Sequence, residues 1–334
     1  MKLYRIVAMI SVFLLTLSLC GCKGQEAQEE YALSEDQKLV IYTAHKKEIY
    51  EPIIKEFEER SGIWVEVVSG GTNQVLEQIA AENGQNSGDV MFGGGVDSLE
   101  AYSVYFQPYR CSQYEQLDAT YASGNDSYTV FSKLPIVFIY NNKLVISAGT
   151  PRSWGELLNY RWQGKIAFAD PAQSGSSYTA LLTLTQILSQ DAEEDQILKD
   201  FANNLAGNVS AGSVEVVDEV IKGERLVGIT LEETALKRIA KGADIGMVYP
   251  AEGTSAVPDG CAIIKNAPHE ANAELFLEFI VSEDVQHLLE DQLYRRSVRK
   301  DMGRQDEMME IAYDLQYSGM HRDEILARWA ELIQ

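Results

Sequence analysis

The sequence lacks the motifs on which most catalysis depends. Histidine occurs only four times in 334 residues, and no two histidines have metal-site spacing. There is no G-x-S-x-G nucleophile turn and no Walker A loop, since Gly164 and Lys165 are followed by Ile166. The run Gly93 to Gly95 lacks the G-x-G-x-x-G spacing of dinucleotide-binding proteins. We therefore predict that the chain is not an enzyme and needs no cofactor or metal.

Basic residues are also in short supply. Lysine and arginine number 28 against 50 acidic residues, which gives a net charge of −22. Nucleic-acid binding needs a basic footprint, so this class of partner is excluded. The acidity itself favours solubility.

Cysteine is scarce, and no CxxC or Cys/His cluster predicts a zinc site. Of the four cysteines, Cys20 and Cys22 lie near the start, and Cys111 and Cys261 lie far apart in the sequence. A disulfide between Cys111 and Cys261 and two buried free thiols are both compatible with the pattern.

The first residues predict export. Lys2 and Arg5 precede an uncharged stretch, residues 6–19, which is too short for the roughly 20 residues of a membrane span. Residues 1–21 are therefore predicted to be a signal peptide. Leu19-Cys-Gly-Cys22 resembles a bacterial lipobox, so we expect a lipid on Cys22 that anchors the protein outside the cytoplasm to the cell membrane. An ordinary cleaved signal and an uncleaved anchor are the alternatives.

Residues 22–36 are polar and have no apolar period, so they predict a tether. Without Lys2 and Arg5 the protein keeps 26 basic and 50 acidic residues, a net charge of −24. About 300 residues remain, which suits two domains of about 150 residues better than one core.

Strand-like and helix-like segments alternate along this part. Residues 38–43 read as a buried strand, and Ile49, Ile53 and Phe57 then recur every four residues on one helix face, before Gly62. The alternation predicts an α/β fold with a largely parallel sheet.

Two apolar runs around Pro135 predict a crossover into a second lobe. We expect lobe 1 to comprise residues 37–132 and 250–334, including the C-terminal helices, and lobe 2 to comprise residues 133–249. In lobe 2, hydroxyl residues predict helix starts: Ser176 or Ser177, Ser213, and a capping box formed by Thr230 and Glu233.

Four turns between strands and helices are rich in glycine and hydroxyl residues. Helix N-termini bind anions, and ligands gather at the carboxyl ends of strands in open α/β sheets. Each turn taken alone also fits ordinary capping and turn chemistry. Together they predict a ligand site formed by Thr43, His45, Ser69, Gly70, Gly71, Thr72, Gly94, Gly95, Ser174, Gly175, Ser176, Ser177 and Tyr178.

Acidic residues lie after two later strands. Glu232 is a candidate acceptor for ligand hydroxyls or an amine, and Glu252 is a second one. Tyr249, in the same turn as Glu252, is also predicted to bind the ligand. A solvated surface role is the alternative for both carboxylates.

The ordered segments 40–45, 89–95, 153–154, 164–171 with 174–176, 227–230 and 249–254 resemble the ferric-iron-type family of ABC-transporter substrate-binding proteins. The resemblance covers residues 38–334 and implies two α/β lobes, joined by crossover strands, with a ligand cleft between them. The family's iron-binding branch uses two adjacent tyrosines near the turn that here reads Thr230 to Glu233, and this sequence has no adjacent tyrosines. The sequence is most similar to the branch that binds hexose phosphates and phosphonates.

That branch holds the phosphoryl group with backbone N–H groups and hydroxyls, and the organic part with acidic side chains. We therefore expect residues 174–177 and 69–72 to hold the anion, and Glu232 and Glu252 to hold the polar tail. The expected protein is a monomer that delivers a small anionic organic solute to a membrane permease. Ferric-iron capture, sensing for a histidine kinase and an exported phosphatase are the alternatives.

Overall fold

The computed structural model describes residues 34–82, 84–85, 87–146, 149–303 and 308–333. Residues 35–334 form one compact unit, which begins with a 3₁₀ turn at Glu35–Gln37. The predicted signal peptide, Cys22 and most of the predicted tether lie outside the described residues. Within the described ranges, no helix is both long and apolar enough to cross a membrane.

The first sheet mixes parallel and antiparallel strands. Its order is β11-β5-β10-β3-β1-β2, and β4 pairs with β10. Strands β1, β2 and β3 are parallel, whereas β10 runs antiparallel to β3, β4 and β5, and β11 runs antiparallel to β5. The bounds are β1 (Lys38–Thr43), β2 (Trp64–Ser69), β3 (Val90–Gly95), β4 (Phe106–Gln107), β5 (Thr129–Lys133), β10 (Pro258–Ile264) and β11 (Arg296–Ser297).

The second sheet has the order β7-β8-β6-β9. Only β7 and β8 are parallel, and β6 pairs antiparallel with β8 and β9. The expectation of largely parallel sheets is therefore wrong, because strands that return from distant parts of the chain insert in the opposite direction. The bounds are β6 (Ile136–Asn141), β7 (Ile166–Ala167), β8 (Val227–Leu231) and β9 (Ile245–Val248).

Helices cover the first sheet with their apolar faces. In α2 (Lys47–Ser61) the predicted residues Ile49, Ile53 and Phe57 are buried. Gly62 ends α2 in the left-handed conformation, with φ of 72°, and its N–H donates to the carbonyl of Glu58 at 2.9 Å. The other helices that contact this sheet are α3 (Thr72–Glu82), α4 (Val96–Ala101), α10 (Glu270–Ile280) and α11 (Glu283–Gln292).

Another set of helices packs on the second sheet. Val216, Val217 and Val220 of α8 (Ser213–Lys222) share an apolar cluster with Val137 and Ile139 of β6. The remaining helices of this part are α5 (Trp154–Leu157), α6 (Gly175–Leu188), α7 (Glu194–Leu205) and α9 (Glu232–Ala240).

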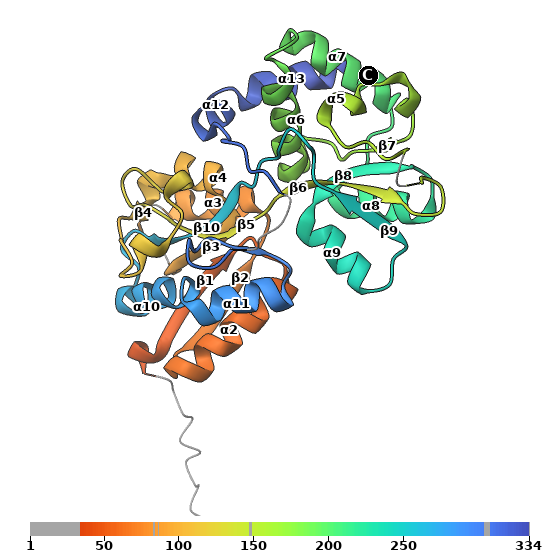
Figure 1. The fold of residues 1–334 in the computed structure, drawn as a ribbon. Coiled ribbons are helices and arrows are strands. Elements are labelled where there is room, and N and C mark those ends of the chain that lie inside the picture. The colour runs from red at the N-terminus through yellow and green to blue at the C-terminus, as the bar shows by residue number, and fades with distance from the viewer. Residues whose placement is uncertain (1–33, 83, 86, 147–148, 304–307, 334) are drawn as a thin grey trace, which may run out of the picture. The chain divides into compact units, whose positions relative to one another are not determined.

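The chain passes between the two sheets at Pro135, which separates β5 of the first sheet from β6 of the second, as the crossover prediction required. It returns between β9 and β10. The last helices are α12 (Leu315–Met320) and α13 (Arg322–Leu332). Helix α12 contacts α4, whereas α13 contacts α7, beside which it lies in Figure 1.

Three predicted helix caps are replaced by other residues. Ser174 caps α6, and its Oγ accepts from the N–H of Ser177 at 3.3 Å. The residue before α8 is Gly212 and the residue before α9 is Leu231, and neither has a capping side chain. Glu233 does not close a capping box, because its carboxylate pairs with Lys237 at 2.6 Å and Arg295 at 3.0 Å.

Cys111 and Cys261 are free thiols, and both are buried. Burial raises the pKa of Cys111 to about 11 and that of Cys261 well above its ordinary value. The thiols are therefore protonated at neutral pH and unreactive.

Candidate ligand-binding site

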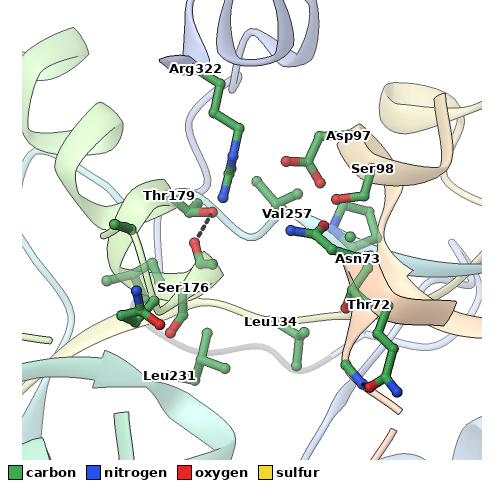
Figure 2. Close-up of a pocket in the computed structure, with 18 residues that line it drawn as sticks. Thr72, Asn73, Asp97, Ser98, Leu134, Ser176, Thr179, Leu231, Val257 and Arg322 are labelled. Atoms are coloured by element: carbon green, nitrogen blue, oxygen red, sulfur yellow. Dashed lines mark hydrogen bonds between the residues drawn. The ribbon is translucent and has the colours of Figure 1, made fainter. Parts of the chain in front are cut away.

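A pocket of about 450 Å³ is lined by residues from both lobes. Figure 2 shows Ser176 and Thr179 on one side, Thr72, Asn73 and Ser98 on the other, and Arg322 between them. Its volume suits a small organic molecule. The lining consists of Gly71, Thr72, Asn73, Gln74, Gly95, Asp97, Ser98, Leu134, Ile136, Ala172, Gln173, Gly175, Ser176, Thr179, Leu231, Val257, Pro258 and Arg322.

The first-lobe wall is built around the start of α3. The chain turns after β2, where the N–H of Gly70 donates to the carbonyl of Thr43 at 3.1 Å, and α3 then begins at Thr72. The first N–H groups of a helix have no partner inside it, so those of residues 72–74 are available at the pocket. Gly94, with φ of 90°, lets β3 pass this turn, since a Cβ there would lie 2.9 Å from Cγ2 of Thr72.

The second-lobe wall is built around the start of α6. The Oγ of Ser174 accepts a hydrogen bond from the N–H of Ser177. The same oxygen lies 3.1 Å from the Oγ of Ser176. Gly175, Ser176 and Thr179 face the pocket, and Thr179 donates its hydroxyl to the carbonyl of Gly175 at 3.1 Å. Two helix N-termini from different lobes therefore contribute to one cavity.

Apolar side chains complete the lining where the chain passes between the lobes. Leu134, Ile136, Leu231, Val257 and Pro258 lie in or beside the two crossover segments. These side chains offer contact area for an organic group without competing for hydrogen bonds.

Charge in the lining comes from two residues of the described chain. Asp97 lies in the first turn of α4, and Arg322 is the first residue of α13. The guanidinium of Arg322 stacks over the ring of Tyr178, 4.3 Å from its centroid. The lining is otherwise neutral and rich in donors.

The predicted residues at the ends of β1 and β2 have other positions. Thr43 is buried, donating its hydroxyl to the carbonyl of Phe92 at 2.7 Å and accepting from the N–H of His45 at 3.1 Å. His45 is buried against Phe92 and Phe131. Ser69 and Gly70 form the turn before the pocket but do not line it.

Ser177 and Tyr178 of α6 are also buried, behind the pocket wall. The hydroxyl of Tyr178 donates to the carbonyl of Ser318 at 2.7 Å. Of the predicted set, Gly71, Thr72, Gly95, Gly175 and Ser176 line the pocket.

Glu232 has a salt-bridge partner inside the protein. Its carboxylate accepts from Nε and Nη2 of Arg296, both at 2.8 Å, and from the hydroxyl of Tyr249. The carboxylate is fully buried and does not line the pocket.

Glu252 caps a helix. It accepts from the N–H groups of Trp154 at 3.1 Å and Gly155 at 3.3 Å, at the start of α5. Neither this carboxylate nor that of Glu232 is placed to hold the tail of a ligand in the pocket.

Several residues that line the pocket are not among the site residues predicted from the sequence. Asn73 and Gln74 directly follow the predicted turn, and Gln173 directly precedes another one, so extending each turn into its helix finds them. Asp97 and Ser98 follow the predicted turn at Gly94 and Gly95, so the same extension into α4 reaches them. Arg322 lies far away in the sequence and reaches the pocket only through tertiary packing.

The described residues contain no group of three or more His, Cys, Asp or Glu side chains that could hold a metal ion. Asp97 is the carboxylate in the described lining, which also lacks tyrosine and histidine. This donor set is poor for ferric iron, which prefers several oxygen or nitrogen ligands.

Comparisons with known proteins agree with this architecture. Residues 100–314 match the model of a family described as bacterial extracellular solute-binding protein. A putative 2-aminoethylphosphonate-binding periplasmic protein of Salmonella typhi is 25% identical over 271 residues, covering 79% of this chain and 78% of the relative. Iron uptake protein A1 of Synechocystis sp. is 25% identical over 304 residues, covering 84% and 81%.

A solved structure has the same fold. The periplasmic binding protein AfuA from Actinobacillus pleuropneumoniae, with exogenous fructose-6-phosphate bound, superposes with a TM-score of 0.75 at 24% identity. The match covers 89% of this chain and 98% of AfuA. The predicted resemblance and the two-lobed fold are thereby confirmed. The chain belongs to the bacterial extracellular solute-binding protein family and has the two-lobed fold of periplasmic binding proteins.

Proposed function

We propose that this protein binds a small phosphorylated or phosphonate organic solute in the pocket and delivers it to the membrane permease of an ABC importer. The observation that carries the proposal is the meeting of two helix N-termini, those of α3 and α6, at one cavity. Each N-terminus presents unpaired N–H groups and a partial positive charge, which together favour an anion.

The hydroxyls around these helix starts extend the same preference. The hydroxyls of Thr72, Ser98 and Ser176 can each donate a hydrogen bond to a phosphoryl oxygen. Gly71 and Gly175 have no side chain, so a ligand can approach the backbone N–H groups there. A phosphoryl group with three oxygens can engage donors from both lobes at once.

The organic part of the solute is assigned to the remaining lining. Asn73, Gln74 and Gln173 offer amide groups to its hydroxyls, and Asp97 offers a carboxylate. These residues take the role that the sequence predicts for Glu232 and Glu252. The carboxylate of Glu232 pairs with Arg296, and that of Glu252 accepts hydrogen bonds at the start of α5.

Membrane attachment through a lipid on Cys22 belongs to the same proposal. It would keep the protein near its permease without a membrane-spanning helix. Incorporation of labelled palmitate that is lost in Cys22→Ala tests the anchor, and equal labelling of the variant would contradict it.

A thermal-shift screen tests the cargo. The probes are fructose 6-phosphate, 2-aminoethylphosphonate, a phosphoglycerate, citrate and ferric citrate. A bound probe at 100 times its dissociation constant stabilises the protein by about 2.7 kcal/mol, an easily measured shift. Stabilisation by phosphorylated or phosphonate probes supports the proposal, whereas stabilisation by ferric citrate but not by citrate favours iron capture.

Two serine variants then locate the anion. Ser176→Ala removes a hydroxyl from the lining and should weaken binding of a stabilising probe about 3- to 10-fold, the worth of one hydrogen bond. Ser177→Ala is the matched control, because the neighbouring hydroxyl is buried outside the lining. Equal affinity of Ser176→Ala and wild type in calorimetry would remove this helix start from the site.

A further inference from the structure

Arg322 occupies an electrostatically unfavourable position. It is the first residue of α13, at the helix end that carries a partial positive charge, where acidic residues are stabilising and cations are not. Its neighbours Asp323 and Glu324 follow the usual preference. A cation in this place needs a compensating partner.

The described part of the protein supplies no anionic partner. No carboxylate there lies within ion-pair distance of Arg322, although Arg328 of the same helix pairs with Asp195. No described group accepts a hydrogen bond from the Arg322 guanidinium either. The side chain is nevertheless partly buried and lines the pocket (Figure 2).

Packing holds this guanidinium in place. One face stacks on the ring of Tyr178 at 4.3 Å, and the hydroxyl of Tyr178 donates to the carbonyl of Ser318 in α12. Stacking on an aromatic ring leaves the N–H groups at the edge of the guanidinium plane free to donate. In Figure 2 the side chain extends toward Thr179 and the interior of the pocket.

We propose that Arg322 forms a bidentate ion pair with the anionic group of the bound solute and selects doubly charged oxyanions over neutral molecules. The inference rests on the proposed function and adds a residue outside the 100–314 span matched by the family model. A guanidinium matches two oxygens of a phosphate or phosphonate, and the ion pair supplies the partner that Arg322 lacks.

Through Arg322, the bound solute would also contact the C-terminal helices. Helix α12 contacts α4, which carries Asp97 and Ser98, whereas α13 contacts α7 on the second lobe. The solute bound to Arg322 therefore contacts a segment that packs against both lobes. Residues 315–332 become part of the binding site.

Isothermal titration of the purified protein with fructose 6-phosphate and with 2-aminoethylphosphonate tests the inference. Arg322→Gln should weaken binding of whichever probe the wild type takes by about 10- to 100-fold, because a charge-assisted bidentate pair is lost. Arg322→Lys should recover only part of the affinity, since an ammonium cannot form the bidentate pair. Arg328→Gln is the matched control on the same helix and should bind within about twofold of wild type.

The outcomes separate the two levels of the proposal. Wild-type binding with unchanged affinity in Arg322→Gln overturns the role of Arg322 and leaves the proposed function standing. Absence of wild-type binding to these two probes and to the phosphoglycerate of the thermal-shift screen overturns the proposed function and the ion pair with it. The thermal midpoint of ligand-free Arg322→Gln should equal or slightly exceed that of wild type, and a large fall would show that Arg322 serves the fold instead.

Discussion

At the scale of single residues, His45 shows what burial does to a titratable group. Its ring is buried between Phe92 and Phe131, and its Nε2 lies 3.5 Å from the carboxylate of Asp259. Burial lowers the pKa of His45 to about 4, and the nearby Arg295 adds to this, while Asp259 and Glu233 oppose it. The imidazole is therefore neutral in the folded protein at neutral pH.

The lowered pKa of His45 predicts a loss of stability in acid. The ordinary pKa of histidine is about 6.5, so between pH 6.5 and 4 the unfolded chain binds a proton that the folded chain does not. The contribution to the free energy of unfolding is constant above pH 6.5, falls through this window and levels off below pH 4. At pH 5 the loss attributable to His45 is about 2 kcal/mol.

Urea unfolding at pH 7 and pH 5 measures this contribution. Wild type should lose about 2 kcal/mol more than His45→Leu between the two conditions, because other groups titrate alike in both proteins. The leucine variant keeps an apolar side chain between the two phenylalanines. Parallel losses in the two proteins would show that His45 is protonated equally in the folded and unfolded states.

Residue by residue, the sequence predicts turns better than side-chain partners. Gly71, Thr72, Gly95, Gly175 and Ser176 lie where local turn chemistry places them. The internal partners of Glu232 and Glu252, by contrast, come from positions far away in the chain. A sequence pattern shows that a carboxylate is present, but it does not show which distant cation pairs with it or which helix start donates hydrogen bonds to it.

At the scale of elements, buried ion pairs join helix α9 to strand β11 and to Arg295, the residue before that strand. Glu232 and Glu233 open α9 of the second lobe, and they pair with Arg296 and Arg295 of the first lobe. Arg295 also donates to Asp259 and Ser132. These contacts fasten the two lobes beside the crossover segments.

Breaking one of these pairs should be costly. Arg296→Leu leaves the carboxylate of Glu232 buried without its cation, so the free energy of unfolding should fall by about 3–5 kcal/mol. The double variant Glu232→Leu with Arg296→Leu should recover much of this loss. Urea unfolding of wild type, Arg296→Leu, Glu232→Leu and the double variant measures the coupling between the two side chains.

An exposed pair provides the control. Arg60 pairs with Glu56 and Asp284 at the surface, where water screens the charges, so Arg60→Leu should lower the free energy of unfolding far less than Arg296→Leu. A similarly small effect of Arg296→Leu would mean that water reaches the carboxylate of Glu232 in the folded state.

Elements with a strong local period are predictable, and elements defined by distant pairing are not. Helix α2 follows from its apolar spacing and its terminal glycine, and β1 follows from its apolar run. The two-residue strands β4 and β11 exist only through their partners. Strand direction in both sheets likewise depends on where the chain returns, which local patterns do not encode.

At the scale of the whole molecule, the negative charge opposes the proposed cargo. A net charge of −22 repels an anionic solute at long range, whereas the donors of the pocket act only at contact distance. Salt shortens the range of this repulsion from about 30 Å at 0.01 M to about 10 Å at 0.1 M.

The association rate should therefore rise with salt. We expect the association rate constant of a phosphorylated or phosphonate probe to increase about two- to fivefold between 10 and 150 mM NaCl. Stopped-flow fluorescence measures the rate, and an uncharged osmolyte at equal osmolality is the control. A rate that falls with salt would mean that Arg322 and the helix N-termini dominate the field at the pocket entrance.

The predicted bounds of the two lobes stay a prediction. We propose one change to them, which concerns the two C-terminal helices. Helix α13 packs against α7, so we assign it to the second lobe, and we assign α12 to the first lobe because it packs against α4. His321 is the residue between the two helices.

The segment that carries Arg322 contributes no strand to either sheet. Arg322 can therefore be exchanged while the strand pairing of both lobes is preserved. In such an architecture, substitutions that change which solute is bound are largely independent of substitutions that affect folding. A descendant that exchanges this one cation for a carboxylate or an amide acquires a new preference without rebuilding its core.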